Sequence, residues 1–210
     1  MASNIEATIS IEQQAHRDDV GARMGMWLFL FTEILLFGGM FLIYAVYRYQ
    51  YPDQFHLAGM ELNTGIGTLN TIILLTSSLT MALSIAAIQK KNKALSIIML
   101  SSTLLFALLF MVNKFFEWSA KISHGIFPGS KELLEKQNGE ILFFGLYYVM
   151  TGLHAFHIII GIVILTFMLV FLIRNKITSD NYVKLENSGL YWHLVDLIWI
   201  FLFPLFYLIQ

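Results

Sequence analysis

The segment from residue 25 to residue 47 restricts the possible folds of this chain more than any other feature. It reads GMWLFLFTEILLFGGMFLIYAVY, Arg23 and Arg48 flank it, and Glu33 is its only acidic or basic side chain. An α-helix rises about 1.5 Å per residue, so this segment spans roughly 34 Å, enough to cross a hydrocarbon core of about 30 Å. We therefore predict a transmembrane helix over residues 24–48.

Further apolar stretches of similar or greater length follow along the chain. They predict helices over residues 65–89, 94–118, 140–173 and 189–208. A short turn with Lys90, Lys91 and Lys93 indicates that the second and third helices form an antiparallel hairpin. Ser179 and Asp180 resemble an N-cap, so the last helix is expected to begin a turn or two before residue 189. The predicted fold class is all-α: a polytopic membrane protein with five transmembrane helices.

The second predicted helix also carries small polar side chains, which let helices approach closely and hydrogen-bond across their interface. They are Asn70, Thr71, Ser77, Ser78, Thr80 and Ser84. The connections at residues 49–63 and 119–139 are predicted to be loops outside the hydrocarbon core.

Composition agrees with a membrane protein and excludes several classes of site. Of the 210 residues, 57% are hydrophobic and 13% are charged, which is too apolar for a soluble domain. The absence of Cys excludes disulfides, thiolate metal sites, iron–sulfur clusters and covalent c-type haem. A net charge of −1 gives no basic footprint for nucleic acid. Residues 1–20 lack an apolar core, so we expect no cleavable signal peptide.

Basic residues are distributed unequally between the two sides of the predicted bundle. The N-terminal side holds Arg17, Arg23, Lys90, Lys91, Lys93, Arg174, Lys176 and Lys184; the other side holds Arg48, Lys114, Lys121, Lys131 and Lys136. Because Lys and Arg favour the cytoplasmic side, the chain is predicted to be N-in/C-out. The predicted organisation is a cytoplasmic N-terminal segment at residues 1–23 and a five-helix transmembrane domain at residues 24–210.

Glu33 is the strongest candidate functional residue. It lies about 15 Å into the first predicted helix, near the midplane of the bilayer. A carboxylate at this depth costs several kcal/mol unless it is paired, hydrated or protonated, so its presence indicates proton handling or a contact with lipid or a partner. The residues on its own helical face are apolar, so any partner must come from another helix. His154 and His157 are the best candidates.

The two histidines of the fourth predicted helix share one face. At 100° per residue, Tyr147, Thr151, His154, His157 and Gly161 fall on a single stripe. Two imidazoles at i and i+3 can bind a metal, but a single helix cannot approach one haem from both sides. Hydrogen bonds to other helices or to lipid headgroups are the alternative, and we favour the interhelical bonds.

Two other polar pairs have the same i, i+3 spacing. His193 and Asp196 can pair directly or serve a functional role, with Trp192 expected at headgroup level. Lys114 and Glu117, at the outer end of the third predicted helix, are expected to form a helix-end salt bridge. No residue of the chain is predicted to be catalytic or to bind a metal.

These residues also carry a family resemblance. The motifs, in order, are EILLF at residues 33–37, LNT at 69–71, Glu117, YVMTGLHAFHIIIG at 148–161, and Glu186 followed by YWHLVDLIW at 191–199. In this order and at these spacings, they resemble subunit III of the haem–copper oxidases, the family of cytochrome c oxidase and related quinol oxidases. The resemblance covers the chain from about Arg23 to its end, and its five-helix form is similar to bacterial members.

The resemblance implies a subunit without a redox centre, whose haem and copper lie in partner subunits. Members pack against the catalytic subunit I, bind phospholipid in a cleft, sustain proton uptake and protect subunit I during turnover. Glu33 matches the intramembrane acid that reacts with carbodiimides in this family. Longer members have two additional N-terminal helices; Lys114 stands where some have Gln, and Trp118 where many have Tyr.

The resulting hypothesis is a non-catalytic subunit III of a bacterial terminal oxidase in the cytoplasmic membrane, acting in aerobic electron transport. Its partners would be subunit I, the other oxidase subunits and phospholipid. The same fold serving a quinol oxidase or a nitric oxide reductase is an alternative, because the chemistry lies in another chain. A proton-coupled transporter using Glu33 is a second alternative, which the lack of an inverted repeat makes weaker.

Overall fold

The computed structural model describes the backbone of residues 2–208 and the side chains of residues 19–208. The helices are α1 (Ala2–Gln50), α2 (Pro52–Met60), α3 (Thr64–Gln89), α4 (Lys93–Ser123), α5 (Lys131–Leu134), α6 (Asn138–Ile173), α7 (Val183–Phe203) and the π-helix η1 (Pro204–Leu208). Within these residues there is no β-strand. Five spans are long and apolar enough to cross a membrane: α1 from Asp19, α3, α4, α6, and α7 continued by η1. The predicted all-α, five-helix fold is confirmed.

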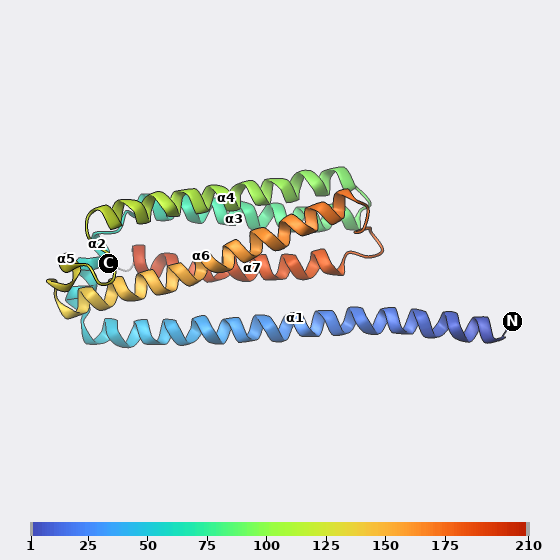
Figure 1. Cartoon of the computed structure of the whole chain (residues 1–210), viewed down its shortest axis with the longest axis horizontal. Coiled ribbons are helices and arrows are strands. Elements are labelled where there is room, and N and C mark those ends of the chain that lie inside the picture. The colour runs from blue at the N-terminus through green and yellow to red at the C-terminus, as the bar shows by residue number, and fades with distance from the viewer. Residues whose placement is uncertain (1, 209–210) are drawn as a thin grey trace.

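The long helices lie side by side, with α7 at the centre of the bundle (Figure 1). Helices α3 and α4 form one side, α6 and α7 the middle, and α1 packs on α6 and α7 from the other side. In the most apolar part of each span, 56% of the residues are buried in α7 but only 11% in α1. Helix α1 is therefore peripheral, and most of its surface is left to lipid or to another protein.

Helices α3 and α4 form the predicted antiparallel hairpin. Asn63 caps α3 by accepting a hydrogen bond from the Ile66 amide at 3.2 Å, and Asn92 caps α4 from the Leu95 amide at 3.1 Å. Between the helices, Lys91 has a φ of 60°, the left-handed conformation that reverses the chain within a short turn. The caps and this turn fix where each helix begins and ends.

The small polar residues of α3 hydrogen-bond across the hairpin as predicted. The Thr80 and Thr103 hydroxyls lie 2.8 Å apart, and the Ser84 hydroxyl donates to the Ser96 carbonyl at 2.9 Å. Small side chains bring the two backbones close, and each buried hydroxyl finds a partner on the facing helix.

Three predicted boundaries were wrong. The connection at residues 49–63 contains α2, which begins with Pro52, a residue that favours the first turn of a helix. Helix α7 begins at Val183 with Tyr182 at the N-cap, so Ser179 and Asp180 do not cap it, although it does start before residue 189 as expected. Helix α4 continues to Ser123, five residues beyond the predicted end.

Trp192 differs from its prediction as well. Its side chain is fully buried rather than at headgroup level, and its indole N–H donates to the Ser77 hydroxyl at 3.0 Å. Gly161 makes this possible, because a Cβ at that position would lie 2.7 Å from the Trp192 ring. The missing side chain lets α6 approach α7 closely, so Gly161 on the predicted stripe is a packing residue.

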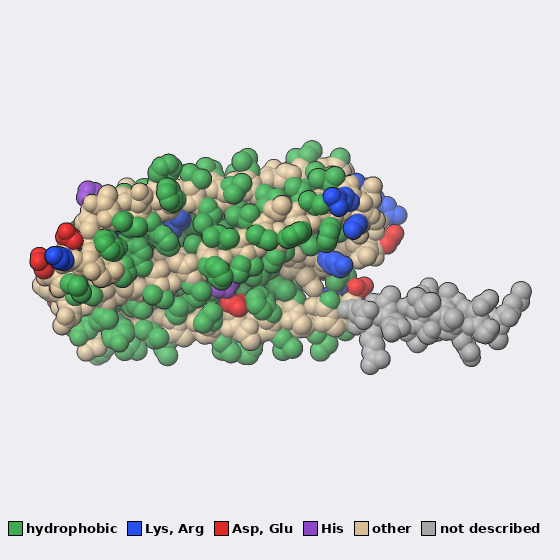
Figure 2. Space-filling view, in the orientation of Figure 1, with side chains coloured by type: hydrophobic (Ala, Val, Ile, Leu, Met, Phe, Trp, Pro, Cys, Tyr) green, Lys and Arg blue, Asp and Glu red, His purple; other side chains and the backbone are tan. Residues whose placement is uncertain are grey.

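Hydrophobic side chains cover the flank of the bundle, and most charged side chains gather at its two ends (Figure 2). This distribution suits a protein that spans a membrane. The orientation remains a prediction from the Lys/Arg bias. A reporter enzyme fused after Gln210 should be active only outside the cell, and one inserted at Lys91 only in the cytoplasm. The reverse pattern at either site would contradict the N-in/C-out assignment.

Candidate functional site

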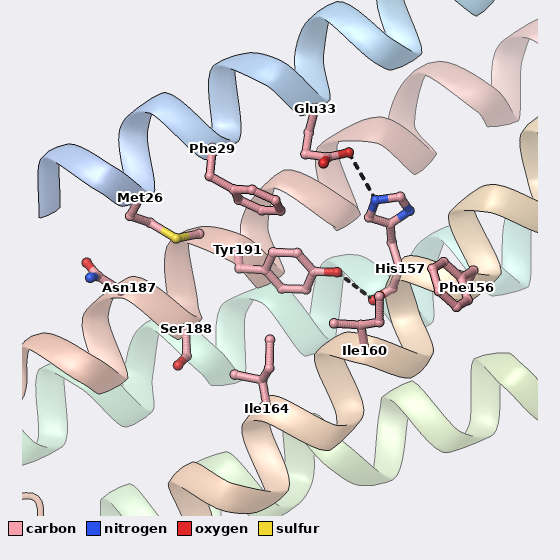
Figure 3. Close-up of a pocket in the computed structure, with 10 residues that line it drawn as sticks. All are labelled: Met26, Phe29, Glu33, Phe156, His157, Ile160, Ile164, Asn187, Ser188 and Tyr191. Carbon is pink, nitrogen blue, oxygen red and sulfur yellow. Dashed lines mark hydrogen bonds and ion pairs between the residues drawn. The ribbon is translucent and has the colours of Figure 1, made fainter. Parts of the chain in front are cut away.

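Glu33 and His157 form a pair between α1 and α6. The Glu33 Oε2 atom lies 3.0 Å from His157 Nε2, and the two side chains are only 14% and 10% exposed (Figure 3). The prediction that the partner of Glu33 comes from another helix is confirmed, and His157 rather than His154 provides it.

The other ring nitrogen of His157 decides how many protons this pair holds. His157 Nδ1 lies 2.8 Å from the Leu153 carbonyl oxygen. A carbonyl only accepts, so Nδ1 must carry a hydrogen. The contact between Nε2 and Oε2 then requires one more proton: either a neutral carboxyl donates to a neutral imidazole, or an imidazolium donates to a carboxylate. In both arrangements the pair holds one shared proton and no net charge, which reduces the cost of burial.

This pair lies on the wall of a cavity between α1, α6 and α7. Its volume is about 500 Å³, and its lining is mostly apolar: Met26, Phe29, Glu33, Phe156, His157, Ile160, Ile164, Asn187, Ser188 and Tyr191 (Figure 3). The Tyr191 hydroxyl donates to the His157 carbonyl at 2.9 Å and so ties α7 to α6 behind the pair. We call this cavity the dyad pocket.

Two apolar grooves follow the seam between α1 and α7 beside the dyad pocket. Their volumes are about 400 and 220 Å³, and both include Ile34 and Leu197 in their walls. His193 is the only acidic, basic or imidazole side chain among the residues that line them. We call them together the seam groove.

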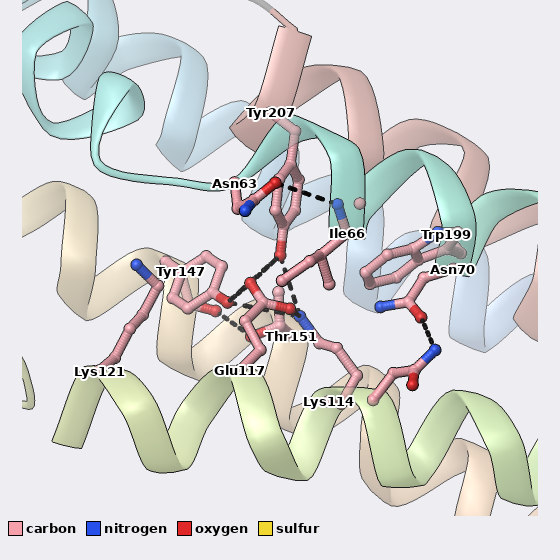
Figure 4. Close-up of polar contacts among 12 residues, drawn as sticks. Asn63, Ile66, Asn70, Lys114, Glu117, Lys121, Tyr147, Thr151, Trp199 and Tyr207 are labelled. Atoms are coloured by element: carbon pink, nitrogen blue, oxygen red, sulfur yellow. Dashed lines mark hydrogen bonds and ion pairs between the residues drawn. The ribbon is translucent and has the colours of Figure 1, made fainter. Parts of the chain in front are cut away.

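A second buried polar cluster lies between α4, α6 and η1 (Figure 4). Lys114 Nζ and Glu117 Oε2 are 3.0 Å apart, and the side chains are 3% and 4% exposed. The hydroxyls of Tyr147 and Tyr207 donate to Glu117 Oε1 at 2.7 and 2.5 Å, and Lys114 donates to the Tyr207 hydroxyl at 3.0 Å. The predicted i, i+3 pair is confirmed, but it lies in the core of the bundle rather than exposed at a helix end.

Tyr207 is the member of this cluster that the sequence analysis missed. It belongs to η1, where the chain leaves α-helical geometry at Pro204. Its ring packs over Gly67 of α3, where a Cβ would lie 2.8 Å from Tyr207 Cδ1. No local sequence pattern indicates that Tyr207, in an apolar helix end, contacts Glu117, which lies 90 residues earlier in the chain. The one sequence signal in this region is Pro204, which indicates a change in helix geometry.

Beyond this cluster, a smaller polar network lies at the end of the bundle that carries α2 and α5. Lys136 contacts Glu61 and also Glu140, the latter at 3.0 Å. Partial burial disfavours the charged form of Lys136, but the hydrogen bonds to Glu61 and Glu140 outweigh it and raise the pKa of Lys136. Lys121 Nζ donates to the Glu61 carbonyl at 3.3 Å, linking α4 to the end of α2. These contacts close this end of the bundle.

His154 does not form the interhelical hydrogen bond that the sequence predicts. It is fully buried, and neither ring nitrogen has a hydrogen-bond partner among the described residues. Its ring stacks on Trp199, with the centroids 5.3 Å apart, and meets Phe110 edge-on at 5.9 Å. Tertiary packing placed His154 among aromatic rings of α4 and α7. Within residues 19–208, no three His, Asp or Glu side chains converge as a metal site.

The direct pair that the spacing of His193 and Asp196 allows does not form. His193 Nδ1 lies 2.6 Å from the Ser78 hydroxyl on α3. The Asp196 carboxyl is buried, and its oxygens have no hydrogen-bond partner among the described side chains and backbone. The i, i+3 spacing permits a contact between the two side chains, but His193 instead forms a hydrogen bond with the Ser78 hydroxyl of the neighbouring helix.

Comparison with known proteins places these features in a family. The family model described as cytochrome c oxidase subunit III matches residues 4–210. Cytochrome c oxidase subunit 3 of Prototheca wickerhamii is 30% identical over 199 residues, covering 90% of this chain and 69% of that protein. A probable quinol oxidase subunit 3 of Staphylococcus saprophyticus is 26% identical, covering 95% of this chain and 94% of that protein.

One relative is much longer than this chain. It is a heme-copper oxidase subunit I+III from Aeropyrum pernix, 28% identical over 193 residues; the match covers 89% of this chain and 22% of that protein. The present chain therefore spans about a fifth of that relative. Five apolar spans, an acid–imidazole pair within the bundle and the family match over residues 4–210 lead to one conclusion. The chain belongs to the cytochrome c oxidase subunit III family.

Proposed function

We propose that this chain is the non-catalytic subunit III of a haem–copper terminal oxidase in a bacterial cytoplasmic membrane, acting in aerobic electron transport. It would pack beside subunit I, and the haem and copper would be held by partner subunits. The observation that carries the proposal is the family match over nearly the whole chain. The printed name of the Aeropyrum pernix relative, subunit I+III, supports subunit I as the main partner.

The partner chains determine whether the complex takes electrons from cytochrome c or from quinol. The names of two relatives point to different donors. The Prototheca wickerhamii protein is named for a cytochrome c oxidase and the Staphylococcus saprophyticus protein for a probable quinol oxidase. The latter is matched over nearly its whole length, which supports a quinol oxidase as the second candidate assembly. A transporter is less well supported, since α1, α3, α4 and α6 run unbroken through their spans and offer no discontinuous helix at mid-depth.

Within the oxidase, the Glu33–His157 pair would support proton uptake by holding one exchangeable proton inside the bilayer. The seam groove would hold phospholipid acyl chains, because its long apolar walls match hydrocarbon. With the grooves filled, the peripheral α1 would be held more firmly against α6 and α7. This role predicts an effect on endurance during turnover rather than on the redox chemistry.

Purification of the tagged chain in mild detergent tests this function. We expect subunit I to co-purify and the complex to show a haem spectrum in visible light. After the partners are removed with harsher detergent, the chain should hold no stoichiometric iron, copper or zinc, because it has no Cys, and within residues 19–208 no three His, Asp or Glu side chains converge. Haem or metal retained by the isolated chain would contradict a non-catalytic role, and a haem-free preparation without subunit I would contradict the oxidase assignment.

A further inference from the structure

The dyad pocket contains a hydrogen-bond acceptor at a depth where phospholipid has no donor. Glu33 lies 14 residues after Asp19 and 17 residues before Gln50, the ends of the described α1 span. At about 1.5 Å per residue, roughly 21 Å of helix separates Glu33 from Asp19 and roughly 26 Å separates it from Gln50. Lipid headgroups lie at the ends of the span, and only hydrocarbon lies at the level of Glu33.

The second oxygen of Glu33 is the acceptor in question. Oε2 is engaged by His157, and among residues 19–208 no hydrogen bond is made to Oε1. In both possible arrangements of the shared proton, Oε1 keeps lone pairs that can accept. An acceptor left unsatisfied in an apolar environment costs free energy, so a bound molecule that donates to Oε1 would be favoured.

The walls of the pocket restrict what that molecule can be. Phe29, Phe156 and Tyr191 provide aromatic surface from three different helices, and Ile160 and Ile164 extend the apolar wall along α6 (Figure 3). A volume of about 500 Å³ lies within the range that accommodates small organic ligands. A ring that carries a hydroxyl and an apolar tail satisfies the acceptor, the aromatic walls and the mid-bilayer depth together.

We propose that the dyad pocket binds a membrane quinol, with one ring hydroxyl donating to Glu33 Oε1 and the ring lying among Phe29, Phe156 and Tyr191. A phospholipid chain would leave Oε1 unsatisfied, and a fatty alcohol would leave the aromatic walls without a ring partner. The proposal concerns binding alone. It holds whether the assembly takes its electrons from cytochrome c or from quinol, and it is independent of what fills the seam groove.

Photolabelling of the full chain with its accompanying subunits tests the proposal. The probe is a benzoquinol with a photoreactive diazirine on its isoprenoid tail, added anaerobically to the complex in phospholipid nanodiscs. Mass spectrometry of this chain should place the label on peptides containing residues 26–33, 156–164 or 187–191. Excess unlabelled quinol should remove the label, whereas equal concentrations of a fatty alcohol or of added phospholipid should not.

Matched variants distinguish the contribution of the Glu33 acceptor to probe binding from that of the space inside the pocket. Glu33→Leu removes the acceptor and should weaken probe binding about fivefold to tenfold, the value of one hydrogen bond. Glu33→Gln keeps a carbonyl oxygen at the same place and should retain binding. Ile164→Trp fills the dyad pocket and should abolish labelling, whereas Ile34→Trp fills the adjacent seam groove and should leave labelling of the dyad pocket unchanged.

Each variant is compared only where the complex co-purifies with native subunit composition. Probe binding in Glu33→Leu as tight as in the wild type, or labelling that persists in Ile164→Trp, would overturn the proposal. So would competition by the fatty alcohol or phospholipid as effective as that by quinol, or the absence of label from these peptides in the wild-type chain.

Discussion

Replacing Lys114 by methionine should destabilise the chain by about 3–5 kcal/mol, because the Glu117 carboxylate would stay buried without its cation. The two tyrosine hydroxyls would still donate to Glu117, but they carry no compensating charge. The double variant Lys114→Met with Glu117→Gln should recover most of the loss, since it removes both charges and keeps a polar group facing the tyrosines. The measurement is unfolding of the purified chain by sodium dodecyl sulfate, followed by tryptophan fluorescence.

Lys136→Met is the matched control for this experiment. Its ion pairs with Glu61 and Glu140 lie at the end of the bundle, where the Lys136 side chain is 26% exposed. We expect a loss of at most about 1 kcal/mol, as for other solvent-accessible pairs. Equal unfolding midpoints for Lys114→Met and Lys136→Met would show that the buried cluster does not need its positive charge.

A hydrophobic carbodiimide should modify Glu33 and leave Glu117 and Asp196 largely unmodified. The reagent dissolves in hydrocarbon and needs a carboxyl that carries a proton. Glu33 shares a proton with His157 and lines an open pocket, whereas Glu117 is ion-paired and Asp196 is only 2% exposed. Asp196 is therefore protected by burial and not by the basic neighbour that its spacing allows. Peptide mapping after brief labelling measures the modification at each acid.

Substitutions of Glu33 should affect how long the complex stays active during turnover more than they affect its assembly. Glu33→Gln preserves the shape and the hydrogen bond to His157, so the complex should assemble and begin oxygen reduction normally. Glu33→Ala leaves a buried imidazole nitrogen without a partner and should weaken packing by about 1–3 kcal/mol. Both variants should lose activity faster than the wild type during sustained turnover.

Oxygen consumption and its decay with time in purified complexes measure this effect. Leu35→Ala, two positions along α1, is the control, because Leu35 is exposed and lines neither the dyad pocket nor the seam groove. A fully assembled, haem-replete Glu33→Gln complex that cannot reduce oxygen at all would refute the supporting role of Glu33.

Predictions from the sequence succeeded where the predicted property depends on the residues of one helix alone. The length of each apolar run is enough to identify a membrane span, since the hydrocarbon core sets the required number of residues. The stripe of residues 147, 151, 154, 157 and 161 is buried throughout, because helical periodicity alone decides which positions share a face. The need of Glu33 for a partner followed in the same way from its apolar surroundings.

Predictions failed where the answer depends on the neighbouring helix. The spacing of His193 and Asp196 cannot reveal that Ser78 of α3 lies within 2.6 Å of the imidazole. Nor can the repeat along α6 reveal that His154 meets Trp199 while His157, one turn away, meets Glu33. Such choices depend on the rotation and offset of packed helices, which are set by residues such as Gly161 that let two helices approach.

The amino-acid order alone predicts the number of spans, the buried faces and the acid that must be satisfied inside the bilayer, because each of these follows from solvation of a single helix. The pairs of side chains that meet depend instead on the packed bundle: His157 meets Glu33, and Tyr207 meets Glu117, which lies 90 positions earlier in the chain. Those contacts arise from the packing of five helices against one another, and no local pattern encodes them.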